Sequence, residues 1–231
     1  MSVPSNPKTY FIRTYGCQAN IADSSTIAGV LESLGFEVFP EPKGKNEDEK
    51  LLKVIQNCDL LIINTCSVRQ KSEDKVYGIG KLLKLPNVTN APRDDVIPHR
   101  KLFIIMAGCM VGSVTGERQR YEFEELKKRT PWVDEYINPS QIMNIPNILF
   151  KNKKLSEWAS NKFKPRFVEN VHNDNTHGFI NISYGCDNFC TFCVVPYARG
   201  AEVSRSEKEV ISEIIHLTKR GFTEFTLCGQ N

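Results

Sequence analysis

Near-continuous apolar runs recur through the first part of the chain, separated by stretches that show helical periodicity. The longest runs lie at 10–16, 59–64 and 101–108, and shorter ones lie at 36–39 and 134–137. Such runs are typical of parallel strands covered on both faces, because no position along the strand has to face water. We therefore expect a strand at each of these places.

The stretches between the runs predict helices. Apolar residues three or four positions apart mark the first helix: Ile27, Val30, Leu31 and Leu34. Asn20 or Asp23 is expected to cap it. Further helices are expected near 49–57, 70–83, 116–129 and 140–150. Alternating strands and helices of this kind predict an α/β fold, an open parallel sheet with helices on both faces.

A second strand–loop–helix–strand unit follows at the end of the chain. Its predicted strands are 178–183 and 222–227, and the helix between them, at about 206–220, has Val210, Ile214 and Leu217 on one face. Parallel barrels place their chemistry after such strands. One unit cannot close a barrel, so we expect a longer protein to supply the later strands.

Two segments lack any sustained period. Residues 86–100 contain three prolines and are expected to form an exposed insertion. Residues 151–177 are rich in Lys and Asn and are expected to connect two domains. His172 and His177 fall in this connection, where a lone histidine is usually solvated.

Composition and charge narrow the class of protein. The 231 residues are 40% hydrophobic and 25% charged, with a formal net charge of +3, which is typical of globular proteins and does not by itself indicate nucleic acid. The sequence contains no apolar run of the roughly 18 residues that a membrane span requires. Its start lacks a signal-peptide pattern. Eight cysteines then indicate a reducing cytosol, where clustered thiols usually bind metal.

Three of these cysteines lie close together in a CxxxCxxC spacing at Cys186, Cys190 and Cys193. One loop can present all three sulfurs to one inorganic cluster, and thiolate is the ligand that iron–sulfur clusters take. A 4Fe-4S cluster held by three cysteines leaves one iron open to a substrate or cofactor. The spacing therefore predicts a reactive cluster rather than a fully ligated electron-transfer site.

Three simpler explanations compete with this one. Structural zinc normally takes four ligands in paired groups, and no second pair lies nearby. A disulfide set needs an oxidising compartment. Cysteine is also common as a small buried hydrophobe, but three within eight residues beside Asp187 and Asn188 make a poor core pattern. The pattern favours metal.

A second set of cysteines is distant in sequence but shares one position in the predicted sheet. Cys17, Cys66 and Cys109 each follow a different strand, and ligands of parallel sheets collect at that edge. The three together predict a second metal site. Cys58 precedes a strand instead, so we interpret it, like Cys228, as a packing residue.

The two triads and their surroundings resemble a known family. The motifs TYGCQAN, NTCSVRQKSEDKVYG, AGCM and GCDNFCTFCVVPYARGAEVSR are similar to those of the radical S-adenosylmethionine (SAM) methylthiotransferases, and among them to the tRNA-modifying MiaB type. The resemblance covers nearly the whole chain apart from the insertion at 86–100. It implies three parts: 1–150 as the methylthiotransferase N-terminal domain with the auxiliary cluster, 151–177 as a linker, and 178–231 as the beginning of a radical SAM partial (β/α) barrel. In the family, the rest of the barrel and an RNA-binding TRAM domain lie in a C-terminal half, which we expect to follow this stretch.

The resemblance also implies a chemistry with two 4Fe-4S clusters and SAM as cofactors. The cluster on Cys186, Cys190 and Cys193 would bind SAM and generate a radical that removes hydrogen from carbon 2 of N6-isopentenyladenosine beside the tRNA anticodon. The cluster on Cys17, Cys66 and Cys109 would carry the sulfur of the methylthio group. Implied partners are tRNA and an electron donor such as flavodoxin or ferredoxin. The enzyme would be a cytoplasmic monomer without a membrane partner, and this stretch alone would bind both clusters but turn over poorly.

Other residues of the motifs allow two interpretations each. Phe192 would pack beside the cluster or the SAM adenine, or simply within its loop. The polar stretch with Arg199, Glu202 and Arg205 would contact SAM or substrate, or form surface ion pairs. Two asparagines beside the first triad would support its cluster, or cap and turn the chain: Asn20 and Asn64.

Two other functions remain open. A sister methylthiotransferase would modify another tRNA base or a ribosomal protein. A non-catalytic module would hold zinc or a cluster for structure alone.

Overall fold

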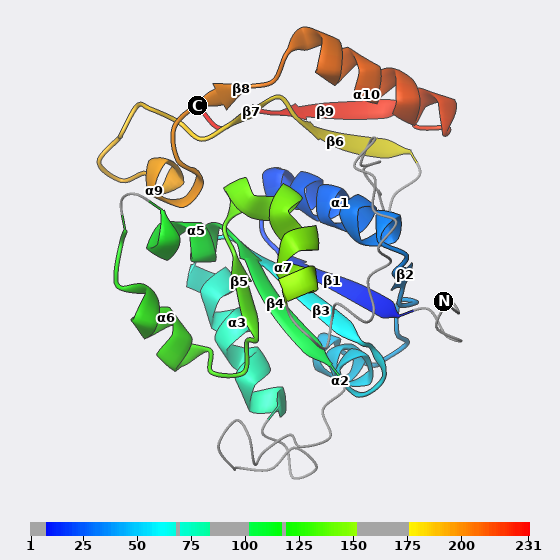
Figure 1. Ribbon diagram of the computed structural model, residues 1–231, viewed down its shortest axis with the longest axis vertical. Coiled ribbons are helices and arrows are strands. Elements are labelled where there is room, and N and C mark those ends of the chain that lie inside the picture. The colour runs from blue at the N-terminus through cyan, green and yellow to red at the C-terminus, as the bar shows by residue number, and fades with distance from the viewer. Residues whose placement is uncertain (1–7, 68–69, 84–101, 117–118, 152–175) are drawn as a thin grey trace.

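The computed structural model describes residues 8–67, 70–83, 102–116, 119–151 and 176–231. Five strands of the first part form one sheet: β1 (Thr9–Tyr15), β2 (Glu37–Val38), β3 (Leu60–Thr65), β4 (Phe103–Gly108) and β5 (Glu135–Ile137). The order is β2-β1-β3-β4-β5, and every neighbouring pair is parallel (Figure 1). The predicted parallel sheet is confirmed.

Successive residues of the central strand enter different cores, which explains its continuous apolar run. Leu60 and Ile62 belong to one core and Leu61 and Ile63 to the other, because side chains alternate across a sheet. The first core lies under α1 (Gln18–Ser33), η1 (Pro139–Asn144) and α7 (Ile145–Lys151), and the second under α2 (Glu47–Asn57), α3 (Gln70–Leu83), α5 (Cys109–Thr115) and α6 (Phe123–Arg129). Helices therefore cover both faces.

The last part of the described chain is built on its own small core. The elements are β6 (His177–Asn181), β7 (Ser183–Tyr184), α9 (Val195–Arg199), β8 (Val203–Ser204), α10 (Glu207–Lys219) and β9 (Glu224–Cys228). β6 pairs with β9 in parallel and β7 with β8 antiparallel. Ile180, Leu217 and Phe222 are buried together under α10. Ser206 accepts a hydrogen bond from the Glu209 backbone and so caps that helix.

This part docks on the carboxyl-end edge of the sheet. Figure 1 shows β6 and β9 lying over α1, while α9 lies beside α5, and the pairs α1–β6 and α5–α9 are in contact. The α5–α9 contact is close because Gly112 has no side chain: a Cβ there would lie 1.8 Å from the Ala198 carbonyl oxygen. At this point the backbones of α5 and α9 are therefore in direct contact, because Gly112 places no side chain between them.

Several predicted elements differ in the structure. The first helix begins at Gln18 with Cys17 at its N-cap, so neither Asn20 nor Asp23 is the cap. Of the predicted helix 116–129, only α6 at Phe123–Arg129 forms, and a separate helix, α5, precedes it, because Cys109 already begins α5 and Gly116 ends it.

The expected strand 178–183 and the expected helix 140–150 are each divided in two. Ile182 separates β6 from β7. Its N–H donates a hydrogen bond to the Cys228 carbonyl, and the chain then turns so that β7 pairs with β8. Pro146 lacks an N–H, and the segment is a 3-10 helix followed by α7. α9 and β8 were not predicted.

The two histidines have different outcomes. His177 begins β6 rather than lying in a connection, and its Nε2 is 2.8 Å from Thr226 Oγ1. His172 and the insertion at 86–100 lie outside the described residues. Of the helices in the described ranges, none is both long enough and apolar enough to cross a membrane.

The close approach of α5 and α9 makes a prediction about stability. Gly112→Ala forces the Ala198 carbonyl away and should lower the free energy of unfolding by about 1–3 kcal/mol, as overpacking does. Gly78→Ala is the matched control, since a Cβ on this helical glycine meets nothing within 4 Å and should stabilise the protein by about 0.5–1 kcal/mol. Urea denaturation measures both. Equal stabilisation by the two substitutions would contradict the α5–α9 contact.

Candidate metal centres

The register of three parallel strands brings Cys17, Cys66 and Cys109 to one edge of the sheet. Tyr15 pairs with Thr65, and Thr65 pairs with Gly108. Cys66 and Cys109 directly follow these paired residues, and Cys17 is two positions past Tyr15. The Cys66 N–H also donates to the Tyr15 carbonyl at 2.9 Å, which extends the ladder to the cysteine itself. The predicted shared edge is confirmed for all three.

The two cysteines that follow the outer strands of these three, β1 and β4, also lie at the start of a helix. Cys17 is the N-cap of α1 and Cys109 is the first residue of α5. The turn before Cys109 requires glycine: Gly108 has a φ of +97°, and a Cβ there would lie 2.4 Å from the Asn64 Oδ1. The sequence AGC thus ends a strand and starts a helix within one residue.

The three thiols are free and differ in burial. Cys66 and Cys109 are buried, and Cys17 is half-buried. A hydrogen bond with Cys66 and burial raise the pKa of the Cys109 thiol, while the Arg199 guanidinium beside it acts in the opposite direction. A cation next to this sulfur favours its thiolate, the form that binds metal.

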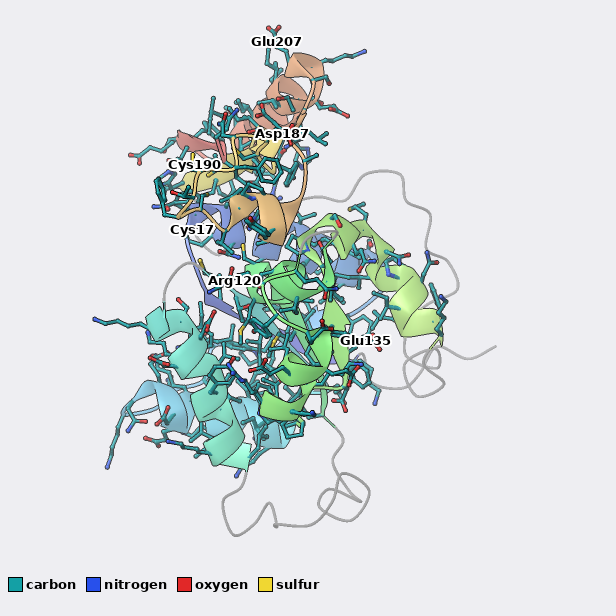
Figure 2. All side chains as sticks on the ribbon, turned by 90° about the vertical axis from the view of Figure 1, so that its left-hand side faces the viewer. Cys17, Arg120, Glu135, Asp187, Cys190 and Glu207 are labelled. Atoms are coloured by element: carbon teal, nitrogen blue, oxygen red, sulfur yellow. The ribbon has the colours of Figure 1, made fainter. Side chains whose placement is uncertain are left out.

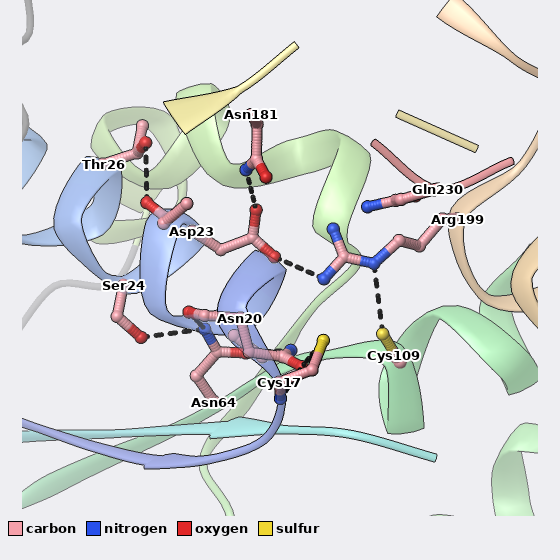
Figure 3. A network of polar contacts seen from close by, with 12 residues as sticks. Cys17, Asn20, Asp23, Ser24, Thr26, Asn64, Cys109, Asn181, Arg199 and Gln230 are labelled. Carbon is pink, nitrogen blue, oxygen red and sulfur yellow. Dashed lines mark hydrogen bonds and ion pairs between the residues drawn. The ribbon is translucent and has the colours of Figure 1, made fainter. Parts of the chain in front are cut away.

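Two buried asparagines fix the helix α1 to the end of β3. Asn20 Oδ1 accepts the Cys17 N–H at 3.2 Å, and Asn20 Nδ2 donates to Asn64 Oδ1 at 3.1 Å. Asn64 Nδ2 donates to the Asn20 carbonyl at 2.8 Å and to Ser24 Oγ at 2.9 Å (Figure 3). Neither asparagine is accessible to solvent. They fix the backbone that carries Cys17, and Asn20 completes the capping box of α1. This agrees with the capping and turning role, and the support of a cluster stays a prediction.

The second triad lies in the loop between β7 and α9. Cys186 is buried, Cys193 is half-buried and Cys190 is exposed. Two donors already point at these sulfurs: Asn188 Nδ2 lies 3.3 Å from Cys186 Sγ, and the Val195 N–H lies 3.5 Å from Cys193 Sγ. Figure 2 shows Cys190 in this loop, above the sheet edge where Cys17 lies. The loop therefore directs two donors at its own sulfurs, and such hydrogen bonds stabilise thiolates.

The described residues contain no group of three or more His, Cys, Asp or Glu side chains converged tightly enough to hold a single metal ion. The sulfurs around a four-iron cluster stand further apart than those around one ion, because each cysteine binds a different iron. The donor set, two triads of free thiols, fits such clusters chemically. A small mononuclear site is not preformed by either triad.

The remaining predicted residues fall into different settings. Phe192 is 91% exposed, so the prediction that it packs within its loop is wrong. Glu202 accepts from Asn231 Nδ2 at 2.5 Å. Arg205 donates to Glu213 at 2.7 Å and to the Asn181 carbonyl at 2.9 Å. It therefore forms an ion pair, although a largely buried one, and its contact with SAM or substrate stays a prediction.

Arg199 is also paired, but in the interior rather than on the surface. Its Nη2 lies 2.6 Å from Asp23 Oδ2, and the two side chains are 3% and 2% exposed. Its Nε donates to Cys109 Sγ at 3.2 Å. Asn181 Nδ2 donates to the other Asp23 oxygen at 3.1 Å (Figure 3). One guanidinium therefore contacts the first triad and links α9 to α1.

Two buried donors beside this network have no hydrogen-bond partner among the described residues: Arg199 Nη1 and Gln230 Nε2. Gln230 Oε1 accepts the Gly185 N–H at 2.8 Å, which fixes the orientation of the amide. Figure 3 shows the Gln230 nitrogen beside the guanidinium. Two buried donors without an acceptor fit a bound group that accepts hydrogen bonds at this position.

The comparisons with known proteins agree with this geometry. Residues 9–137 match the model of the uncharacterized protein family UPF0004. The chain belongs to this family. It is 36% identical over 233 residues to a tRNA-2-methylthio-N(6)-dimethylallyladenosine synthase of Carboxydothermus hydrogenoformans, an alignment that covers 97% of this chain and 46% of the relative.

Other relatives with the same name match equally well. The protein of Dictyoglomus thermophilum is 37% identical over 228 residues, covering 96% of this chain and 45% of the relative. That of Ehrlichia canis is 34% identical over 233 residues, covering 97% and 46%. The resemblance to the methylthiotransferases is thus confirmed. The chain spans about half the length of the curated relatives that it matches.

Sequence reasoning missed three residues of the polar network beside Cys109: Asp23, Asn181 and Gln230. Asp23 carried a usable signal, because a carboxylate on the buried face of a helix needs a partner. Cys228 was interpreted as packing. It is buried, and burial together with the nearby charges of Cys17 and Asp23 raises the pKa of its thiol, so it also lies near the site. Cys58 is a core residue, as predicted.

The asparagine pair makes a prediction about stability. Asn64→Ala removes the hydrogen bonds that join Asn64 to Asn20 and Ser24, and it leaves buried groups unsatisfied. It should lower the free energy of unfolding by about 2–3 kcal/mol. Asn147→Ala is the control, because this exposed side chain bonds only Asn144 among described residues, and its effect should stay within about 0.5 kcal/mol. Equal losses of unfolding free energy for Asn64→Ala and Asn147→Ala in urea denaturation would contradict the role of Asn64 in fixing α1 to the end of β3.

Proposed function

We propose that this chain is the cluster-binding half of a tRNA methylthiotransferase that holds two 4Fe-4S clusters. The observation that carries the proposal is the placement of two triads of free cysteines on the two sides of one boundary: three at the carboxyl edge of the sheet and three in the β7–α9 loop. The names of the relatives support the reaction class. The activity, substrate and partners are those of the longer protein.

In this proposal each triad ligates one cluster. Cys17, Cys66 and Cys109 ligate the auxiliary cluster, and Cys186, Cys190 and Cys193 ligate the cluster that takes SAM. Each triad leaves one iron without a protein thiolate, because a four-iron cluster offers four positions. When bound, the clusters and SAM supply radical chemistry and sulfur for the addition of a methylthio group to carbon 2 of N6-isopentenyladenosine next to the tRNA anticodon.

The protein's own contribution is to position and shield these groups. The buried Cys66 and Cys109 fix two ligands rigidly at the sheet edge. The exposed Cys190 and the 91% exposed Phe192 leave the loop accessible from its outer side, where Phe192 packs against the adenine of SAM in our proposal. Glu202 and Arg205 lie directly before and after β8 and form the polar wall of the SAM site in our proposal.

The proposed division of the chain follows from the same arrangement. Residues 1–150 form the domain of the auxiliary cluster. The predicted linker 151–177 is shortened by one residue, because His177 already belongs to β6, and the beginning of the radical SAM barrel follows from β6 to residue 231. The parallel β6–α10–β9 unit supports the barrel. Leu227 on β9 is 52% exposed, as expected for a strand face that later elements of a barrel cover. We further propose a cytoplasmic monomer that binds tRNA and receives electrons from a flavodoxin or ferredoxin.

Iron and sulfide content tests the proposal. After anaerobic reconstitution the chain should contain about eight irons and as many sulfides, since two 4Fe-4S clusters require them. The variants Cys186→Ala/Cys190→Ala/Cys193→Ala and Cys17→Ala/Cys66→Ala/Cys109→Ala should each retain about four. Cys58→Ala, a core cysteine away from both triads, is the control and should keep about eight. Zinc without sulfide in all four proteins would contradict radical chemistry and leave a structural metal module.

A further inference from the structure

Arg199 joins the two halves of the described chain through a single guanidinium. Its Nη2 contacts Asp23 in α1 at 2.6 Å, 176 residues away in sequence, and its Nε contacts Cys109 Sγ at 3.2 Å. Asn181 of β6 donates to the second oxygen of Asp23. The side chain of Arg199 is only 3% exposed. The contacts therefore depend on the docking of α9 and β6 on the sheet domain.

The burial of this pair makes its geometry demanding. Moving a carboxylate and a guanidinium out of water is costly, and their attraction compensates only when the hydrogen bonds are well formed. Both oxygens of Asp23 are satisfied, one by Arg199 and one by Asn181. The planar guanidinium donates in fixed directions. Asp23 thus holds Arg199 in the one orientation that points Nε at the Cys109 sulfur.

A donor directed at a cluster-ligating sulfur affects more than the fold. Hydrogen bonds and positive charge near the ligand sulfurs stabilise the reduced cluster, because reduction adds negative charge. Arg199 supplies both to Cys109. The guanidinium that donates to Cys109 comes from α9, in the second half of the described chain.

We propose that Arg199 is a positioning residue that sets the reduction potential of the auxiliary cluster, with Asp23 orienting its guanidinium. The inference rests on the proposed function, since it requires a cluster on Cys17, Cys66 and Cys109. The inference goes beyond the proposed function because it makes the reduction potential of that cluster depend on the docking of the domain that holds the other cluster. The competing role is a latch that joins the domains and leaves the potential unchanged.

Redox titration of the isolated auxiliary cluster separates these roles. The background is Cys186→Ala/Cys190→Ala/Cys193→Ala, reconstituted and counted for iron, with the reduced cluster followed by electron paramagnetic resonance. Arg199→Lys is added to it. Lysine keeps the cation that Asp23 needs, so the fold is retained, but one ammonium cannot contact Asp23 and Cys109 from two fixed nitrogens. Arg129→Lys is the control, because Arg129 pairs with Glu125 on the exposed surface of α6.

We expect the ratio of reduced to oxidised cluster at a fixed potential to fall about tenfold in Arg199→Lys, which is about 59 mV for a one-electron couple. The Arg129→Lys control should titrate like the background. Asp23→Asn/Arg199→Met removes both charges together, avoids an unpaired buried carboxylate, and should also lower the potential. Unchanged potentials in both Arg199 variants would overturn the inference. Fewer than about four irons in the background itself would instead contradict the proposed function.

Discussion

The parallel register of β1, β3 and β4 is the constraint on which the rest of the site depends. Because Tyr15, Thr65 and Gly108 are paired side by side, three cysteines that are more than 40 residues apart from one another in sequence end at one edge. A shift of one residue in any strand would send the following cysteine to the other face of the sheet. The buried apolar residues on both faces make such a shift costly. The packing of the core therefore fixes the ligand geometry.

The second half of the described chain completes this edge. The loop with Cys186, Cys190 and Cys193 lies over it, and Arg199 reaches from α9 into it. The tight passage of α9 over Gly112 brings the guanidinium within reach of Asp23 and Cys109. Each half thus carries one triad, and the groups that surround the first triad come from both.

The sequence predicted the strands, the parallel sheet and the shared position of Cys17, Cys66 and Cys109, because apolar runs and strand ends are local signals. It did not predict that α5 begins at Cys109, since CMVGSV continues the apolar run and conceals the turn that Gly108 makes. The pairing of Asp23 with Arg199 was also missed. Periodicity carries no information on which polar side chains, 176 residues apart, meet when distant parts of the chain pack together.

The central claim is that two iron–sulfur clusters lie on the two sides of the domain boundary. An anomalous difference map at the iron absorption edge, from anaerobic crystals of the reconstituted chain, tests it most directly. The account predicts two separate iron peaks, one among Cys17, Cys66 and Cys109 and one in the loop of Cys186, Cys190 and Cys193, with Arg199 beside the first. A single peak in the loop, with the thiols at the sheet edge free of iron, would contradict it.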